Sequence, residues 1–373
     1  MKEIQFSIVV MTILICSALI LLMPERVRRD TVINRSRWLM VGAFGLIGAQ
    51  FLIQYVTHLR EIGITQAVLV NLTFFLPASV LMDTSILNLQ RQGRLSKVEK
   101  WVGAVVWVIV MVILTITVWA DGNSLEKLSE NVRVTEICLS TTYAAMQLYY
   151  SILQFQELEH MQEAIENYYD SERKGLTRWM TYVISINGML AIFVPLTIFG
   201  SNILIGIFAL AFFWGIFMMW FSFVRYFTSN DIYRVREAEE NAKEITQEEK
   251  SVVKSKTTEG NGLSADILQH ISQKANRWIA TGAYLKTGIT SPMAADAMNI
   301  PRYQLTAWVK EAGHNSFTHW ITSLRVEEAK RMLQLHPDWT NEAVADHCGF
   351  SRAYFQKIFK KETGISPMEF STQ

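Results

Sequence analysis

The first 225 residues contain a series of long apolar runs, and these runs limit the fold more than any other feature of the chain. A helix needs about 20 predominantly apolar residues to cross the hydrocarbon core of a bilayer. Runs close to this length are Phe6–Met23, Trp38–Val56, Trp101–Trp119, Trp179–Phe199 and Ile203–Phe223. Two further runs contain polar residues: Ile64–Leu87, with Asn71, Pro77 and Asp83, and Val134–Phe155, with Glu136, Gln147 and Gln154. The pattern predicts an all-α chain that begins with a seven-helix transmembrane domain over residues 1–225.

The basic residues of the predicted loops support this count and indicate an orientation. Lys and Arg concentrate in loops that remain on the cytoplasmic side. Loops 24–37, 88–100 and 156–178 together hold 12 Lys or Arg residues, whereas the N-terminus and the alternate loops hold 4. This alternation places the N-terminus outside and the C-terminus in the cytoplasm, and it would be lost without the span Val134–Phe155. Phe6–Met23 is followed rather than preceded by basic residues, so we expect an uncleaved span.

Three polar residues inside predicted spans, Asp83, Asn71 and Glu136, are candidates for a functional site. Ionisable side chains in hydrocarbon are costly, and they usually face protein or a water-filled cavity. One interpretation is therefore a pocket for a small molecule or an ion. The other, which we favour from the sequence, is that Asp83 lies near the cytoplasmic end of its helix, solvated by lipid headgroups.

Residues 226–262 link the apolar half of the chain to a charged C-terminal half. Residues 229–253 favour a helix with a short heptad seam formed by Val235, Ala238, Ala242, Ile245 and Val252. Because the seam contains two alanines, it is weak. The helix is either a signal-carrying element that forms a homodimer or a solvated spacer. The polar stretch 254–262 contains two glycines and is expected to be a flexible hinge.

Residues 263–373 show the same helical punctuation twice. A helix predicted over Pro292–Met298 is followed by a tight turn and a second helix over Arg302–Glu311, which Gly313 ends. About 50 residues later the order recurs, with Asn341–His347, the turn Cys348–Gly349–Phe350 and Arg352–Glu362. One long helix, Ser316–Leu335, joins the two units, and another that begins at Ser264 precedes them. The spacing predicts two helix-turn-helix units in one cytoplasmic domain.

The segments "LRVEEAKRML" (324–333), "AVADHCGFSRAYFQKIFKKETGISPMEF" (343–370) and the unit at 290–311 resemble the DNA-binding domain of AraC/XylS-type transcription regulators. The residues that carry the resemblance are Ala345, Gly349, Phe350, Phe355, Phe359, Gly364 and Pro367. The resemblance implies two recognition helices that enter successive major-groove segments on one face of the duplex. The chain departs from the family pattern in having four residues between Phe350 and Phe355, Pro301 where a capping Ser is usual, and Ala307 at a position that is often basic.

The helical faces of the two second helices suggest which residues contact DNA. Leu305, Trp308 and Val309 should be buried in the first unit, and Phe355, Ile358 and Phe359 in the second. The remaining faces provide the candidate DNA-binding residues Arg302, Tyr303, Thr306, Lys310, Arg352, Ala353, Gln356, Lys357, Lys360 and Lys361. Gln can read adenine and Arg or Lys can read guanine, whereas Lys360 and Lys361 are expected to contact phosphates. The alternative for any one of these residues is a merely solvated surface.

The sequence therefore predicts a membrane-integral regulator of bacterial type that binds specific DNA sequences from the cytoplasmic face of the inner membrane. Its expected partners are double-stranded DNA, membrane lipid, an unknown small-molecule or membrane signal, and a second copy of the chain through residues 229–253. Residues 264–373 carry 12 Lys or Arg and 10 Asp or Glu, so modest non-specific DNA binding is expected. No nucleophile–base pair, metal-ligand spacing or cofactor motif is apparent, which argues against an enzyme. The alternative is a membrane receptor or transporter whose tail acts by protein contact.

Overall fold

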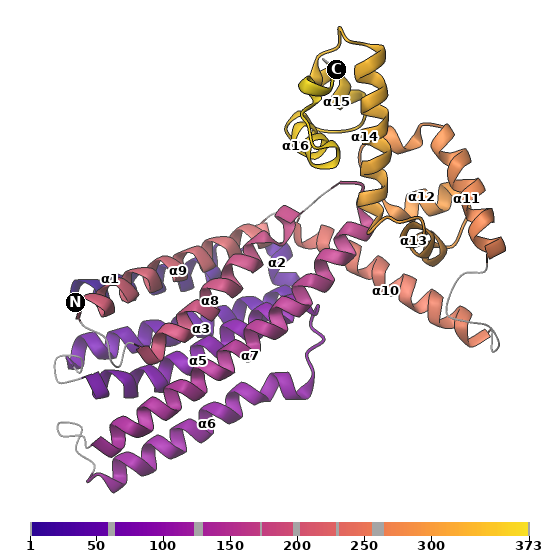
Figure 1. Ribbon diagram of the computed structural model, residues 1–373. Helices are drawn as coiled ribbons and strands as arrows, with labels where there is room; N and C mark the ends of the chain where they lie inside the picture. The colour runs from indigo at the N-terminus through magenta and orange to yellow at the C-terminus, as the bar shows by residue number, and fades with distance from the viewer. Residues whose placement is uncertain are drawn as a thin grey trace. The chain divides into compact units, whose positions relative to one another are not determined.

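The described part of the protein is helical throughout. The computed structural model describes residues 2–58, 64–122, 130–171, 174–196, 202–228, 231–255 and 265–371 (Figure 1). Within these ranges it contains helices and one isolated bridge between Tyr169 and Thr290, and no strand. The all-α prediction is confirmed. The chain divides into two compact units, the first formed by Met1–Glu159 and Gly175–Ile232 and the second by His160–Lys174 and Tyr233–Gln373.

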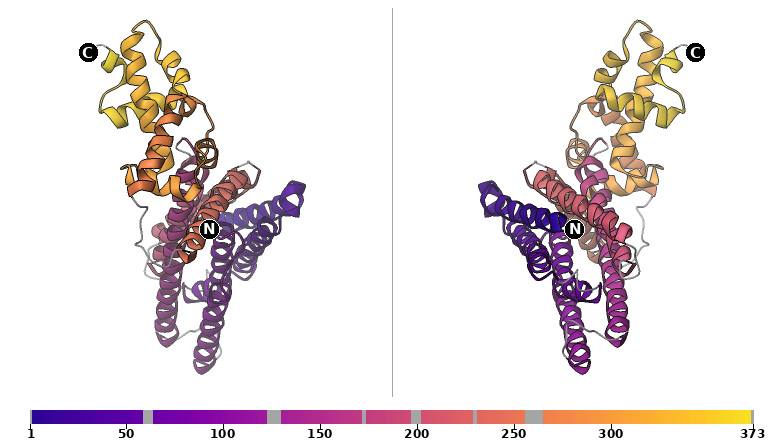
Figure 2. Two further views of the ribbon diagram at one scale, coloured as in Figure 1. Left: turned by 90° about the vertical axis from the view of Figure 1, so that its right-hand side faces the viewer. Right: turned by 90° about the vertical axis from the view of Figure 1, so that its left-hand side faces the viewer.

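The first unit consists of long helices, which Figures 1 and 2 show from three directions. They are α1 (Lys2–Leu21), α2 (Glu25–Arg29), α3 (Thr31–Thr57), α5 (Ile64–Gln90), α6 (Lys97–Ala120), α7 (Glu130–Tyr168), α8 (Arg178–Leu196) and α9 (Asn202–Thr228), with the short 3₁₀ helix η1 (Lys174–Leu176). Each of the seven predicted spans overlaps one of these helices. Polar caps mark two of the starts, because Asp30 accepts hydrogen bonds from two backbone N–H groups of α3 and Ser96 forms a capping box with Glu99 in α6.

Four helices of the described ranges are long and apolar enough to cross a membrane. They are Glu3–Leu21, Thr31–Thr57, Val68–Gln90 and Lys97–Ala120. A fifth span is formed if the bent pair Leu210–Tyr226 and Asp231–Glu249 is taken as one. By length and composition these helices are suited to cross a membrane, whereas membrane residence and the count of seven spans stay predictions.

The expected loop at 156–178 is wrong in its first part, because α7 continues as a helix to Tyr168. Residues 156–168 are too polar for a bilayer, but Leu158, Met161, Ile165 and Tyr168 recur at helical spacing and are buried. Hydropathy shows where a helix leaves the hydrocarbon, and it does not show where the helix ends. The end of α7 and the turn after it, His160–Lys174, belong to the second compact unit.

The second unit contains the remaining helices. They are α10 (Asp231–Ser255), α11 (Ala265–Ala280), α12 (Ser291–Met298), α13 (Arg302–Glu311), α14 (Phe317–Leu335), α15 (Asn341–His347), α16 (Arg352–Thr363) and α17 (Pro367–Ser371), together with the 3₁₀ helix η2 (Ala283–Leu285). These bounds reproduce the two predicted helix-turn-helix units and the helix that joins them. Ser264, the expected cap of α11, and most of the expected hinge at 254–262 lie outside the described residues.

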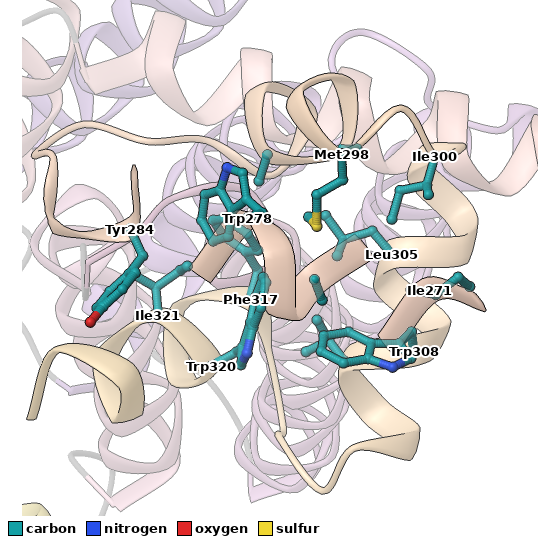
Figure 3. Packing of buried hydrophobic residues seen from close by; sticks show 14 of the residues in the cluster. Ile271, Trp278, Tyr284, Met298, Ile300, Leu305, Trp308, Phe317, Trp320 and Ile321 are labelled. Carbon is teal, nitrogen blue, oxygen red and sulfur yellow. The ribbon is translucent and has the colours of Figure 1, made fainter. Parts of the chain in front are cut away.

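Two hydrophobic clusters hold the two helix-turn-helix units, and α14 contributes to both. Its N-terminal residues Phe317, Trp320 and Ile321 lie in the first cluster (Figure 3), and its C-terminal half supplies Val326, Ala329, Met332 and Leu333 to the second. In the first cluster the Trp320 ring lies 5.6 Å from that of Trp278 and 5.3 Å from that of Trp308. A buried indole N–H needs a partner, and Trp308 donates to the Ser272 hydroxyl at 2.8 Å. Large aromatic side chains thus fix how α11, α13 and α14 meet.

The predicted heptad seam lies on α10, but two of its positions are already buried within one chain. Val235 is 2% exposed and Ala238 is fully buried, whereas Ala242 and Ile245 are half-buried. The side chain of Val252 lies outside the described residues. Homodimerisation through this helix stays a prediction, and it could use only the later part of the seam.

Candidate nucleic-acid interface

The second helix-turn-helix unit is formed by α15, a glycine turn and α16. The Thr340 hydroxyl accepts a hydrogen bond from the Ala343 N–H and begins α15. Gly349 then adopts φ +72°, a conformation that disfavours any residue with a Cβ atom. A Cβ at this position would also stand 2.3 Å from the Leu285 carbonyl oxygen. The turn is therefore restricted to glycine by both its backbone angle and its close neighbour.

The turn is apolar on its inner side, and this affects the chemistry of Cys348. The side chain is fully buried in the second cluster, and burial raises the pKa of its thiol to about 12. A thiol with so high a pKa is a poor nucleophile and a poor metal ligand. A structural role in the packing of the second cluster fits this environment.

Helix α16 has one buried face and one exposed cationic face. Phe355, Ile358 and Phe359 are at most 4% exposed, as their spacing predicts. The exposed side chains are Arg352, Gln356, Lys357, Lys360 and Lys361. The side chain of Ala353 lies outside the described residues. Arg352 pairs with Glu342 of α15 at 3.1 Å, so its guanidinium is held beside its own unit.

The first helix-turn-helix unit has the same architecture, but its candidate DNA-binding residues are less exposed. Asn299 closes the turn after α12 in the left-handed conformation, with φ 51°, and α13 buries Leu305, Trp308 and Val309. The other candidates on this helix are Arg302, Tyr303 and Thr306, which are half-buried, and Lys310, which is exposed.

Two of these cations face carboxylates from outside the helix-turn-helix domain. Arg302 Nη1 lies 2.6 Å from Glu244 Oε2 and 3.4 Å from Asn241 Oδ1, both on α10. Lys310 Nζ lies 3.4 Å from Glu163 Oε1 near the end of α7. The two helix-turn-helix units therefore differ in how their cations are paired. The exposed lysines of α16 have no ion pair among the described residues.

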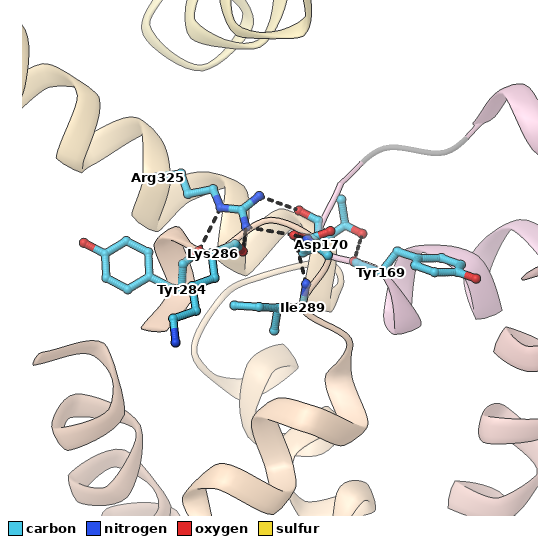
Figure 4. A network of polar contacts seen from close by, with 8 residues as sticks. Tyr169, Asp170, Tyr284, Lys286, Ile289 and Arg325 are labelled. Atoms are coloured by element: carbon cyan, nitrogen blue, oxygen red, sulfur yellow. Dashed lines mark hydrogen bonds and ion pairs between the residues drawn. The ribbon is translucent and has the colours of Figure 1, made fainter. Parts of the chain in front are cut away.

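A buried polar network connects the residues after α7 to α14 (Figure 4). Arg325 Nη2 lies 2.8 Å from Asp170 Oδ2, with the two side chains 1% and 2% exposed. The same carboxylate oxygen accepts hydrogen bonds from the N–H groups of Gly288 and Ile289 at 2.9 and 3.2 Å. Arg325 also donates to the carbonyls of Tyr284 and Lys286, at 2.8 and 2.6 Å. Each of the two charges is therefore compensated by the other and by backbone groups.

Neighbouring contacts extend this network along α7. The Thr318 hydroxyl donates to the Tyr169 carbonyl at 2.5 Å. Tyr168 donates to Glu237 of α10 at 2.6 Å. The pKa of the Tyr168 phenol is raised, mainly because the side chain is buried and also because of this hydrogen bond. The sequence signal for the network is weak: Arg325 lies within an otherwise apolar stripe of α14, but its partner is 155 residues away.

The polar residues inside the predicted spans occupy different places. Asp83 is fully buried and accepts hydrogen bonds from Gln147 and Gln154 of α7 at 2.7 and 2.9 Å. The favoured interpretation, in which lipid headgroups solvate Asp83, is therefore wrong. Asn71 accepts hydrogen bonds from Gln50 and Gln54 of α3, at 2.7 and 3.0 Å.

The described part of the first unit contains two hollows near these groups. One is bounded mostly by apolar side chains, together with a few polar ones that include Gln147, the partner of Asp83. A second is bounded in part by Asn71. Glu136 is fully buried on α7 and lines neither hollow. A ligand pocket that uses all three residues stays a prediction. No cluster of His, Cys, Asp or Glu suited to a metal ion occurs among the described residues.

Comparison with known proteins bears on the C-terminal domain. Residues 294–373 match the family model of a helix-turn-helix domain. Over 72 residues, 19% of the chain, the sequence is 32% identical to the uncharacterized transcriptional regulatory protein YesN of Bacillus subtilis. That stretch is 19% of the relative, so the chain spans about a fifth of the relative's length. No solved structure gave a significant match. Residues 294–373 therefore form a helix-turn-helix domain of the AraC type.

Proposed function

We propose that this protein is a membrane-integral transcription regulator that binds specific DNA sequences through its two helix-turn-helix units under the control of a signal received by its membrane helices. The observation that carries the proposal is the cationic face of α16 in a domain of the AraC type. Gln356, Lys357 and Lys360 project from a helix whose opposite face is anchored by Phe355 and Phe359. A helix fixed in this way can present its outer side chains to the major groove.

The exposed apolar surface of the first compact unit, which holds the long apolar helices, supports residence in a membrane. Along α6 the exposed side chains include Trp101, Val105, Val108, Val112 and Ile116, each more than half exposed. So large an apolar face requires a partner that is itself apolar. A lipid bilayer is the partner that fits helices of this length. The basic loops support a cytoplasmic location for the C-terminal domain, where bacterial DNA is accessible.

Capture of genomic fragments by the full-length protein in lipid nanodiscs, followed by footprinting, tests the proposal. Gln356→Ala with Lys357→Ala should lower the affinity for a captured fragment at least about tenfold, because base contacts contribute roughly 1–3 kcal/mol each. The captured fragments should share a sequence motif, and the footprint should cover it.

A matched control removes the same two residue types elsewhere on the domain. Gln269 lies on α11 and Lys286 follows η2, and both side chains are exposed. Gln269→Ala with Lys286→Ala should leave the footprint unchanged. Equal affinity of the α16 variant and the control would refute the assignment of α16 as the reading helix. Fragments without a shared motif would refute sequence-specific binding.

A further inference from the structure

We propose that α7 and α10 hold the first helix-turn-helix unit in a state closed to DNA, with Glu163 and Glu244 occupying the places of DNA phosphates against Lys310 and Arg302. The proposal rests on the proposed function, because it assigns regulation to the same DNA-binding face. Its partner is intramolecular: a carboxylate pair presented by the two helices that are continuous in sequence with the predicted spans.

The charges on the first helix-turn-helix unit have the arrangement that a closed state requires. Arg302 and Lys310 are both on α13, about two helical turns apart and therefore on neighbouring parts of one face. Each has a carboxylate oxygen within ion-pair distance, 2.6 Å for Arg302 with Glu244 and 3.4 Å for Lys310 with Glu163. Both carboxylates are 60% exposed, so neither is required for the hydrophobic core. A DNA backbone that approached α13 would meet these two negative charges first.

Exposed ion pairs are too weak to keep helices together, so another contact must hold α7 in this place. The buried network around Asp170 provides it. Asp170 lies two residues after the end of α7 and contacts Arg325 of α14 and the backbone between η2 and α12 (Figure 4). Because burial excludes water, breaking any of these contacts leaves a polar group unsatisfied. The buried network thus fixes the end of α7, and the exposed carboxylates cover α13.

Among the described residues, no carboxylate from α7 or α10 pairs with the cations of the second helix-turn-helix unit. Its exposed lysines on α16 have no ion pair among the described residues, and Arg352 pairs only with Glu342 of the same unit. The protein in this state has one helix-turn-helix unit open and one closed. Release of α7 from α13 adds the contacts of Arg302 and Lys310 to those of α16. α7 is one helix from Glu130 to Tyr168, so Glu163 lies on the same helix as the predicted span Val134–Phe155.

The test uses the full-length protein in lipid nanodiscs and a fluorescent duplex of mixed sequence, because phosphate contacts do not depend on sequence. Glu163→Gln with Glu244→Gln should raise affinity about tenfold at about 50 mM salt, since two cations become available to phosphates. The slope of log K against log salt should become more negative by about 1.8, or about 0.9 for each added phosphate contact.

Two matched variants separate this effect from a general loss of negative charge. Glu249→Gln with Asp338→Asn removes the same charge from exposed positions that have no ion pair among the described residues, and it should leave the slope unchanged. In a background of Arg302→Gln with Lys310→Gln, neutralising Glu163 and Glu244 should have no further effect. Equal gains for the test and control variants, or a full gain in the Arg302/Lys310 background, would overturn the closed state.

Failure of the proposal and failure of the proposed function are distinguishable. If the parent protein binds duplex DNA and the Glu163/Glu244 variant binds with the same affinity and slope, only the closed state is refuted. If neither binds this duplex at low salt and the full-length protein also captures no genomic fragment, the proposed function is itself refuted, and the closed state with it.

Discussion

At the scale of single residues, glycine and aromatic side chains decide the shape of the DNA-binding domain. Gly349 and Gly313 both have positive φ values, of +72° and +87°, but their surroundings differ. A Cβ at Gly349 would meet the Leu285 carbonyl, whereas a Cβ at Gly313 would have no neighbour within 4 Å. This pair separates the cost of backbone conformation from the cost of close packing.

Gly349→Ala should destabilise the domain more than Gly313→Ala. The left-handed conformation alone costs a residue with a Cβ roughly 1–2 kcal/mol. At Gly349 the overlap with a backbone oxygen adds to this, so the total should exceed about 3 kcal/mol. Hydrogen exchange of α14 and α16 amides in the full-length protein measures both losses. Equal losses at the two positions would show that the approach of η2 to the turn does not matter energetically.

At the scale of elements, the sequence predicted helices well and predicted their contacts poorly. The two helix-turn-helix units follow from capping residues, glycines and 3.6-residue spacing, all of which are local. The continuation of α7 beyond Phe155 had a local signal in Leu158, Met161 and Ile165, which the change in hydropathy obscured. The ion pair of Asp170 with Arg325 had none, because a charge pair between distant segments leaves no periodic trace.

Loss of either member of this pair should strongly destabilise the contact of α7 with α14. Arg325→Met leaves a buried carboxylate without its cation, and removing one partner of a buried pair costs about 3–5 kcal/mol. Asp170→Leu should cost a similar amount. Because each single change includes the penalty for the unpaired partner, the double variant should cost clearly less than the two combined.

Hydrogen exchange of the α14 amides gives the local opening free energies for this cycle. Lys330→Met, which removes an exposed ion pair on the same helix, should change them by less than about 1 kcal/mol. Additive effects of the Asp170 and Arg325 changes would show that the two side chains are not coupled.

At the scale of the whole molecule, the chain combines apolar helices with a DNA-binding domain. Four described helices satisfy the requirements of a membrane span, and seven segments were predicted. One of the other predicted spans lies on α7, whose Gln147 and Gln154 donate hydrogen bonds to Asp83 inside the protein. Hydropathy counts these two side chains as polar, although their amide N–H groups have a hydrogen-bond partner within the protein.

Labelling of single cysteines from outside intact cells tests the topology in a variant that lacks the native cysteines. Seven spans place Ser124→Cys outside, and Arg94→Cys and Gly175→Cys inside. Only the first should react with a membrane-impermeant maleimide, and permeabilisation should expose the other two. Reaction of Arg94→Cys or Gly175→Cys in intact cells would contradict the predicted arrangement.

The sequence by itself determined the helical class, the apolar segments, the two helix-turn-helix units and the buried aromatic face of α16. These properties depend on spacing along a helix and on the preferences of capping and turn residues, and both are local. Only the tertiary structure decided that Asp83 is buried between α5 and α7, that Asp170 meets Arg325, and that Glu163 and Glu244 face α13. Those contacts join segments far apart in the chain, and their stability arises from burial and charge compensation that exist only after the helices have packed.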